Sequence, residues 1–270
     1  MAKNPTHPGA QMELDGAVVI VTGSATGLGA AVAQRLAGKG ARVVINYTKS
    51  EAEANATAQA CQELGADTLL CRADVSDDGD CRRMVSAAAE RFGRLDGLVN
   101  NAAQSIIVPH ADLEALSGDD FMRIFAVNVV GPYQMIRAAA PHMKKQGKGS
   151  IVNISSVSGM TGSGSSIAYA VSKGALNTMT LSLARALAPE IRVNAVCPGV
   201  MQTRWWREGL GEDGYQAFIQ RYADAAPLQT AGTPEAVAEP VVWLLEGADH
   251  VTGETIMVDA GSHLGGAPRR

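Results

Sequence analysis

Tyr169 and Lys173 form the residue pair in this chain whose types and spacing could move a proton. A spacing of four residues places two side chains on the same face of a helix, one turn apart. Tyrosine, with a pKa of about 10, is a poor general base at neutral pH, and a neighbouring cation favours its phenolate. We therefore expect Lys173 to lower the pKa of Tyr169. Such pairs also occur on many helix surfaces, so the interpretation depends on other motifs, which include Ser156 upstream.

A glycine-rich turn near the start of the chain could hold a dinucleotide. Gly23, Gly27 and Gly29 follow an apolar segment and precede a helix expected at 27–38. Glycines at these places let the backbone bend, approach a pyrophosphate closely and pack the helix against the strand, with the helix amides facing the phosphates. Glycines that serve only a tight turn are the alternative. The predicted cofactor contacts in this turn are Gly23, Ser24, Thr26, Gly27, Leu28 and Gly29.

The end of the second predicted strand bears on which dinucleotide binds. Sites that prefer NAD commonly hold the adenosine ribose with a carboxylate roughly 20 residues beyond the glycines. Here Tyr47 is followed by Thr48, Lys49 and Ser50, and the first acid, Glu51, lies in the next helix. Lys49 and the hydroxyls could bind a 2′-phosphate, which a carboxylate would repel. We favour NADP(H) over NAD(H), with Tyr47, Thr48 and Lys49 as contacts. If Lys49 is only a solvated residue at a helix start, an NAD(H)-preferring or dual-specificity enzyme remains possible.

Short β-branched runs alternate with alanine-rich helical stretches along the chain. This alternation predicts an α/β fold with a doubly wound parallel sheet. The runs at 18–21 and 43–45 are continuously apolar, as strands covered by helices on both sides should be, so they belong at the sheet centre. The seven predicted strands are 17–22, 42–47, 68–71, 97–100, 150–154, 191–197 and 255–258.

Length and composition predict one domain. A chain of 270 residues suits a single large core, which we place at 13–270 after a flexible N-terminal tail at 1–12. The net charge of −4 gives no basic footprint for nucleic acid. We find no apolar signal segment and no run long enough to span a membrane, so we expect a cytoplasmic protein. The cysteines lack the close pairs of zinc sites, and we expect no metal; they are Cys61, Cys71, Cys81 and Cys197.

The segment 167–188 is apolar almost all round, with Lys173 and Arg185 as its only charges. A helix without a polar face must be covered on both sides. The cover could be the rest of the chain or a second subunit, and we favour a homo-oligomer.

These motifs resemble the short-chain dehydrogenase/reductase family over about 14–261. The resemblance implies a seven-stranded, single-domain Rossmann fold and a dimer or tetramer. Further matching positions are Asn100 to Ala103 after the fourth strand, Asn128 in the next helix, Ile154 to Ser156 ending the fifth strand, and Pro198, Gly199 and Thr203 after the sixth.

Residue roles follow from the resemblance. It implies that Tyr169 is the general acid/base, that Ser156 binds the substrate oxygen, and that Lys173 binds the nicotinamide ribose. Asn128 would steady the helix and a water chain to Lys173. The remaining cofactor contacts that it implies are Asp74 and Val75 at the adenine, Asn101, Ala102 and Ala103 beside them, and Pro198, Gly199, Val200 and Thr203 at the carboxamide.

Two positions depart from the family pattern. Ala103 stands where the family usually has glycine, which adds a methyl group near the cofactor. Thr26 stands where many NADP-preferring members have Arg or Lys, so the NADP(H) prediction lacks one usual support.

The stretch at about 200–226 is rich in aromatic residues. In the family it forms a mobile lid over the substrate, and Trp205 and Trp206 are the predicted substrate contacts. Aromatics that only dock a helix pair onto the core are the alternative. The loop 104–110 would form the opposite wall, with His110 more typical of a surface residue.

The implied reaction is reversible hydride transfer between nicotinamide and a small-molecule carbonyl or secondary alcohol. A 3-oxoacyl thioester, a cyclic ketone and a sugar all remain open as substrates. A non-catalytic dinucleotide-sensing protein is the alternative from a different class.

Overall fold

The computed structural model describes residues 12–265 of the chain. The tail expected at 1–12 lies outside the described residues except for Met12, which is buried against the core rather than loose. No described helix is long and apolar enough to cross a membrane.

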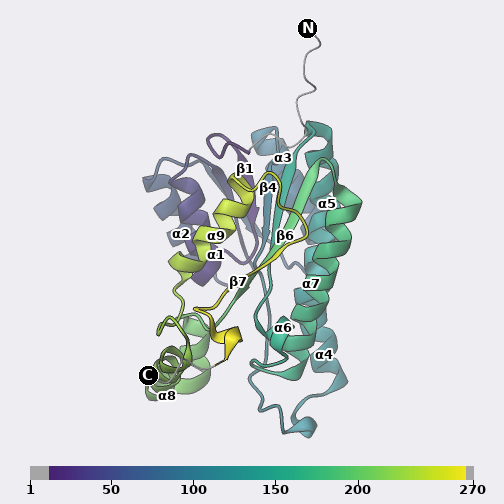
Figure 1. Cartoon of the computed structure of the whole chain (residues 1–270). Coiled ribbons are helices and arrows are strands. Elements are labelled where there is room, and N and C mark those ends of the chain that lie inside the picture. The colour runs from purple at the N-terminus through teal and green to yellow at the C-terminus, as the bar shows by residue number, and fades with distance from the viewer. Residues whose placement is uncertain (1–11, 266–270) are drawn as a thin grey trace.

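The described strands form one parallel sheet in the order β3-β2-β1-β4-β5-β6-β7. Every predicted strand is confirmed, with each end within one residue of its expected place, and the α/β class with a doubly wound sheet is confirmed as well (Figure 1). The observed bounds are β1 (Val18–Val21), β2 (Arg42–Tyr47), β3 (Thr68–Arg72), β4 (Gly97–Asn100), β5 (Gly149–Ile154), β6 (Ile191–Pro198) and β7 (Thr255–Val258).

Helices cover both faces of the sheet. One face packs against α1 (Gly27–Ala37), α2 (Glu51–Glu63) and α9 (Pro234–Glu246). The other packs against α3 (Asp78–Phe92), α5 (Gly131–Gln146) and α7 (Ile167–Leu187). Figure 1 shows these two layers on either side of the strands. All four residues of β1 are buried, which accounts for the continuous apolar run there.

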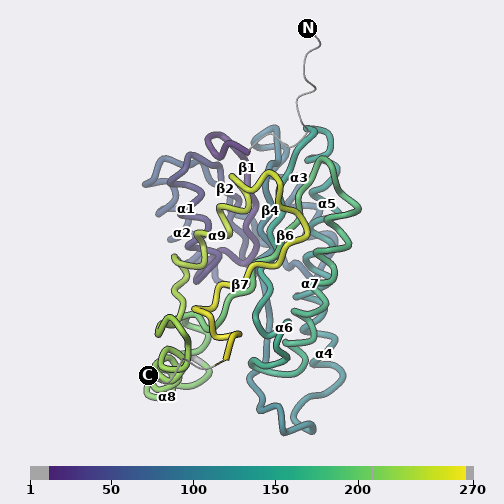
Figure 2. The backbone as a smooth tube through the Cα atoms, in the orientation of Figure 1, coloured from purple at the N-terminus to yellow at the C-terminus, as the bar shows by residue number. Residues whose placement is uncertain are grey.

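The winding direction reverses between β1 and β4. From β1 the chain adds β2 and then β3 on one side, and from β4 it adds β5, β6 and β7 on the other. Figure 2 lets the eye follow this path from the purple strands to the yellow β7. The loops after β1 and β4 therefore diverge and leave a crevice at the carboxyl edge of the sheet, where ligands of such folds bind.

Three further helices lie at this edge. They are α4 (Gly118–Phe125), followed directly by a π-helical turn (Ala126–Val130), α6 (Ser158–Thr161), and α8 (Arg204–Ala225), which contains the predicted lid. Gly211 interrupts α8 with a φ of 69°, so the segment is two helical pieces joined at a kink. Across the crevice from α8 lie α4 and α6 (Figure 1).

Helix α7 is buried on one face only. Ala168, Leu176 and Ala184 are buried, whereas Val171 and Leu181 on the outer side are 49% and 45% exposed. The described part of the chain therefore does not cover this helix on both sides.

Asp96, just before β4, ties two strands together. Its carboxylate is 1% exposed, accepts a hydrogen bond from the Val18 amide at 2.9 Å, and pairs with Arg94 at 2.7 Å. Removing one partner of a buried charged pair leaves the other groups without compensation.

We predict that Asp96→Ala lowers the free energy of unfolding by about 3 kcal/mol, measured by urea denaturation. The matched control is Asp67→Ala, because Asp67 pairs with Arg91 while both side chains are about half exposed. That change should cost less than about 1 kcal/mol. Equal losses in the two variants would contradict the structural role of Asp96.

Candidate active site

Adjoining cavities open at the carboxyl edge of the sheet. One, of about 540 Å³, is lined by Gly23, the end of β2 and Asp74. The next, of about 180 Å³, is lined by Ser156, Tyr169 and Lys173. Asn101 and Ala103 line both cavities, so they form one continuous cleft.

The glycine turn is held in a shape that leaves room for a ligand. Gly23 and Gly27 have φ angles of +60° and +58°, which favour glycine. A Cβ on Gly29 would lie 2.5 Å from the Gly23 carbonyl oxygen and 2.6 Å from Asn101 Nδ2. Asn101 Nδ2 donates at 2.9 Å to the carbonyls of Thr22 and Gly23. The Thr26 side chain makes no capping bond to α1, so it leaves the first amides of this helix to another partner, and residues 26–28 line the cleft.

Lys49 has a cationic neighbour that the sequence analysis missed. Tyr47 of β2 pairs in register with Arg72 of β3. Lys49 and Arg72 line the same hollow together with Thr48 and Asp74. The predicted third strand ended at residue 71, one residue before Arg72. Placing β3 beside β2 would have indicated Arg72, because the two strands end next to each other.

Asp74 and Val75 both line the larger cavity, as expected for adenine contacts. The Asp74 carboxylate accepts from the Ser76 amide at 2.9 Å and from the Ser76 hydroxyl at 2.7 Å. These bonds fix its orientation at the mouth of the cleft.

Helix α7 brings Tyr169 and Lys173 into the smaller cavity. The Ser166 hydroxyl caps this helix by accepting from the Tyr169 amide at 3.2 Å. Lys173 Nζ lies 5.6 Å from the centre of the Tyr169 ring and donates to the Ile154 carbonyl at 2.8 Å. Ser156, which follows β5, lines the same cavity. The three side chains are thus brought together, although Ser156 follows β5 and the other two lie in α7.

Burial sets the electrostatics of this pair. It raises the pKa of Tyr169 to about 12, an effect that the Ser156 hydroxyl partly opposes, and it lowers the pKa of Lys173 to about 8. The expectation that Lys173 lowers the pKa of Tyr169 is wrong for this arrangement. The ammonium faces the Ile154 carbonyl, and desolvation of the phenol outweighs other effects.

Asn128 lies in the π-helical turn and is buried. Its side chain accepts from the Gln104 amide at 2.8 Å and donates to the Gln104 carbonyl at 2.9 Å and to Ser172 Oγ at 3.0 Å. The residue therefore joins the loop after β4 to α7, next to Lys173. Widened turns of this kind are frequent at functional sites.

The backbone after β6 passes close to the end of the cleft. Pro198, Gly199, Val200 and Thr203 all line the smaller cavity. A Cβ on Gly199 would lie 2.1 Å from the Tyr222 hydroxyl, so only glycine fits there. Tyr222, which belongs to the aromatic-rich stretch at about 200–226, therefore packs on this segment.

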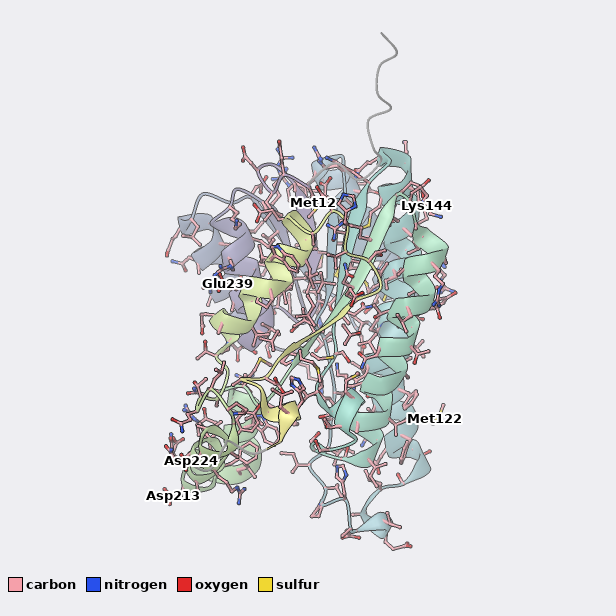
Figure 3. The ribbon with its side chains drawn as sticks, in the orientation of Figure 1. Met12, Met122, Lys144, Asp213, Asp224 and Glu239 are labelled. Carbon is pink, nitrogen blue, oxygen red and sulfur yellow. The ribbon has the colours of Figure 1, made fainter. Side chains whose placement is uncertain are left out.

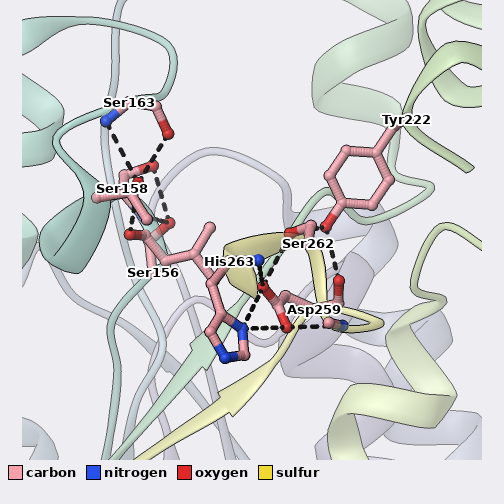
Figure 4. A network of polar contacts seen from close by, with 10 residues as sticks. Ser156, Ser158, Ser163, Tyr222, Asp259, Ser262 and His263 are labelled. Carbon is pink, nitrogen blue, oxygen red and sulfur yellow. Dashed lines mark hydrogen bonds and ion pairs between the residues drawn. The ribbon is translucent and has the colours of Figure 1, made fainter. Parts of the chain in front are cut away.

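A polar network fixes Tyr222 (Figure 4). Its hydroxyl lies 2.9 Å from Ser262 Oγ and 3.0 Å from the Asp259 carbonyl oxygen. The buried Asp259 carboxylate accepts from Ser262 Oγ and the His263 amide, each at 2.8 Å, and contacts His263 Nδ1 at 2.9 Å. Burial acts to raise the pKa of Asp259, but these hydrogen bonds outweigh it and lower that pKa. The network ties α8 to the segment after β7.

The aromatic residues of α8 divide into two groups. Trp205 and Trp206 line the smaller cavity, with ring centres 4.4 Å apart. Tyr215 is buried, and Phe218 packs against Trp206 with ring centres 4.6 Å apart. The cavity lining agrees with a substrate role for Trp205 and Trp206, which stays a prediction, whereas the burial of Tyr215 agrees with a docking role for that residue.

The loop 104–110 meets this helix. A Cβ on Gly209 would lie 2.4 Å from Ile107 Cδ1. His110 is partly buried and does not line either cavity. In the part of the chain that the structure describes, no group of His, Cys, Asp and Glu side chains could hold a metal ion.

The sequence of this chain is similar to those of known proteins over most of its length. The model of a family described as enoyl-(acyl carrier protein) reductase matches residues 23–263. A relative from Streptomyces violaceoruber, named as a ketoacyl reductase of the granaticin polyketide synthase, is 44% identical over 92% of this chain and 96% of its own length. Glucose 1-dehydrogenase 2 of Bacillus subtilis is 35% identical over 93% of this chain and 96% of its own.

Solved structures agree. A short-chain dehydrogenase/reductase from Burkholderia xenovorans is 40% identical, with a TM-score of 0.85, over 92% of this chain and 98% of its own. A xylitol dehydrogenase with bound NAD⁺ is 28% identical, with a TM-score of 0.84, over 92% of this chain and 99% of its own.

The buried ammonium of Lys173 predicts a pH dependence of stability. Its pKa is about 8 in the folded protein and about 10.5 when exposed. Between these values the unfolded chain binds more protons, so stability rises with pH. Relative to Lys173→Met, the free energy of unfolding of the unmodified protein should rise by roughly 1 kcal/mol from about pH 7 to pH 9. Parallel curves for the two proteins in urea denaturation would show that the ammonium is not buried as described.

Proposed function

The chain belongs to the short-chain dehydrogenase/reductase family, whose members named above act on keto or alcohol groups, and from this premise we propose an NADP(H)-dependent oxidoreductase. It transfers a hydride between the nicotinamide and a carbonyl or secondary alcohol of a 3-oxoacyl, cyclic ketone or sugar substrate. The observation that supports this most is the single cleft in which Ser156, Tyr169 and Lys173 adjoin the glycine turn.

The cleft fits a dinucleotide. A Cβ at Gly29 or Gly199 would collide with neighbouring protein atoms, so the chain packs closely at both places. Close packing of this kind is what a dinucleotide cradle requires of its glycines. The open amides of α1 suit a pyrophosphate. When bound, the nicotinamide would supply or accept the hydride. The residues expected at its carboxamide are Pro198, Gly199, Val200 and Thr203, and those expected near the adenine are Asp74, Val75, Asn101, Ala102 and Ala103.

The chain's own residues would handle the proton. Tyr169 would give its phenolic proton to the carbonyl oxygen in reduction, a role that suits a phenol whose pKa keeps it protonated. Ser156 would donate a hydrogen bond to the same oxygen as negative charge develops on it. Lys173 would hold the ribose, and Asn128 would keep α7 and the loop after β4 in register.

The NADP(H) preference is supported by charge at the end of β2. Lys49, Arg72 and Thr48 line one hollow, which Asp74 and Asp80 also line. The Asp80 carboxylate is bonded to the Arg83 guanidinium and the Asp74 amide, and the Asp74 carboxylate is bonded to Ser76. Lys49 and Arg72 are therefore the cations in this hollow that suit a 2′-phosphate. The solved xylitol dehydrogenase carries NAD⁺, and L-rhamnose 1-dehydrogenase from Sphingomonas is named for either dinucleotide, so the family itself allows both. NAD(H) preference or dual specificity is the alternative outcome.

A non-catalytic dinucleotide sensor is set aside. The relatives are named as reductases and dehydrogenases, and this chain has a serine, a tyrosine, a lysine and an asparagine at the matching positions.

We also propose a homo-oligomer, either a dimer or a tetramer. Apolar side chains are exposed on the neighbouring helices α4, α5 and α7, and Met122 projects outward from α4 (Figure 3). An assembly that covers these helices would remove the apolar side chains from water, which stabilises the assembly. The side chains concerned are Met122, Tyr133, Val171 and Leu181.

We predict that Tyr169→Phe lowers kcat by about 10²-fold or more, because it removes the proton donor. Dinucleotide affinity should stay within about threefold, since the ring keeps its packing. Turnover and NADPH binding are measured on the same preparation. The matched control is Tyr133→Phe on the outer side of α5, and near-native turnover in Tyr169→Phe would refute the assignment.

We predict that Lys49→Glu reduces the ratio of kcat/KM with NADPH to that with NADH by roughly 10- to 100-fold, because a carboxylate repels the 2′-phosphate. Arg72→Ser should reduce it by a smaller factor. Lys145→Glu, an equal charge change at the far end of α5, serves as the control. An unchanged ratio in Lys49→Glu would favour dual specificity.

A further inference from the structure

Ser158 places a second hydroxyl beside Ser156 in the substrate cavity. Ser158 lines the cavity and is 6% exposed. Its Oγ lies 3.1 Å from Ser156 Oγ, and its amide donates to Ser156 Oγ at 3.1 Å. One short turn at the start of α6 therefore sets the spacing of the two hydroxyls.

The surrounding backbone keeps the Ser158 hydroxyl in this position. Gly164 has a φ of +135°, and a Cβ there would lie 2.4 Å from Ser158 Oγ. Only glycine therefore allows the hydroxyl to point where it does. The amide of Val157 donates to the Pro198 carbonyl at 3.1 Å, which holds the turn against the end of β6.

The two hydroxyls can serve two acceptors at once. In this structure the Ser156 hydroxyl donates a hydrogen bond to Ser158 Oγ, so this bond does not use the proton of the Ser158 hydroxyl. When Ser156 turns to donate to the reacting oxygen, the Ser158 hydroxyl can donate its own proton to an acceptor beside that oxygen. Two oxygens on neighbouring carbon atoms of one molecule can lie about as far apart as the two serine Oγ atoms, which are separated by 3.1 Å. With a substrate that lacks the second oxygen, the Ser158 hydroxyl can only turn back to donate to Ser156 Oγ, so the two kinds of substrate differ by one hydrogen bond.

The cavity suits a neutral molecule. Among the described residues that line it, Lys173 has the only ionised side chain. One of its three N–H groups donates to the Ile154 carbonyl, and the others are the donors proposed for the ribose. A carboxylate or phosphate on the substrate would lose water without gaining a partner there.

The wall opposite Ser158 is aromatic. Trp205 and Trp206 enter the cavity from α8, which lies across the crevice from α6 (Figure 2). Flat indole faces favour the apolar face of a ring over a flexible chain.

We propose that Ser158 binds the oxygen on the carbon next to the reacting one, so that the substrate is a neutral, ring-bearing α-hydroxy ketone, or a vicinal diol in the reverse direction. This rests on the proposed function. In reduction the carbonyl carbon gains a hydride from the reduced nicotinamide, the carbonyl oxygen gains a proton from Tyr169, and the nicotinamide is oxidised. The neighbouring oxygen keeps all its bonds and acts only as a hydrogen-bond partner of Ser158.

The test compares three ring ketones with the full chain and NADPH: 2-hydroxycyclohexanone, 4-hydroxycyclohexanone and the anionic 4-oxocyclohexanecarboxylate. We expect kcat/KM for the 2-hydroxy compound to exceed that for the 4-hydroxy compound by roughly tenfold, and the anion to be the poorest substrate. Equal values for the two hydroxy ketones, or a preference for the anion, would overturn the proposal.

Ser158→Ala should bring the ratio of the 2-hydroxy to the 4-hydroxy compound close to one. Ser163→Ala should leave it unchanged, because that exposed hydroxyl bonds to Thr161 and does not line the cavity. If Ser158 were only structural, its removal would lower both rates equally and keep the ratio, which would also overturn the proposal.

A binding measurement separates this inference from the proposed function. The two hydroxy ketones are titrated into the NADPH-loaded protein while tryptophan fluorescence is followed. Tighter binding of the 2-hydroxy compound that Ser158→Ala abolishes, without any turnover, would support the subsite and refute the reductase assignment. Equal binding would refute the subsite, whether or not either ketone is reduced.

Discussion

The reversal of winding between β1 and β4 is the constraint on which the site depends. Parallel strands need crossover helices, and where the crossovers change direction the adjacent loops separate. The glycine turn follows β1, and Asn101 follows β4, so the amide of Asn101 can bond the carbonyls of Thr22 and Gly23 across this gap. The cradle is therefore shaped by two distant segments that only the sheet brings together. Its floor is rigid because β1 and β4 are completely buried.

Desolvation is the second physical effect that gives the site its character. The same burial raises the pKa of Tyr169 and lowers that of Lys173. The phenol is thus protonated at neutral pH but is a weaker acid than free tyrosine, whereas the pKa of the ammonium lies close enough to neutral pH for a bound ligand to change its protonation. Lys173 remains buried because α7 packs against β6 and because the Ile154 carbonyl accepts a hydrogen bond from its ammonium. The site is thus preorganised by packing, with few direct bonds between the reacting side chains themselves.

The sequence was sufficient for the strands because β-branched runs alternate with alanine-rich stretches, and the runs at 18–21 and 43–45 are continuously apolar. Tyr169 and Lys173 could also be placed, since a spacing of four fixes the helix face. The position of Arg72 beside Lys49 could not be predicted, because it depends on the register of β3 beside β2. Tyr222 was equally hidden, since its partners at Asp259 and Ser262 lie beyond the next helix and strand. The pKa of Tyr169 was predicted in the wrong direction because adjacency on a helix says nothing about burial or about the competing carbonyl of Ile154.

The structure separates what the reaction requires from what chooses the substrate. Side chains held by the sheet and α7 could act on any carbonyl, and relatives named for ketoacyl groups and for glucose share the fold. The walls of the smaller cavity come from α6 and α8, and they differ in chemistry, because α6 contributes the Ser158 hydroxyl and α8 contributes two indole rings. Tyr222 packs on Gly199 and bonds the Asp259 carbonyl, so the proposed lid and the backbone expected at the carboxamide share one contact. We therefore expect a change in α8 to affect cofactor binding together with substrate choice. A change at Ser158 in α6 should act mainly on the substrate, because the hydroxyl and amide of Ser158 bond to Ser156 and not to Tyr222.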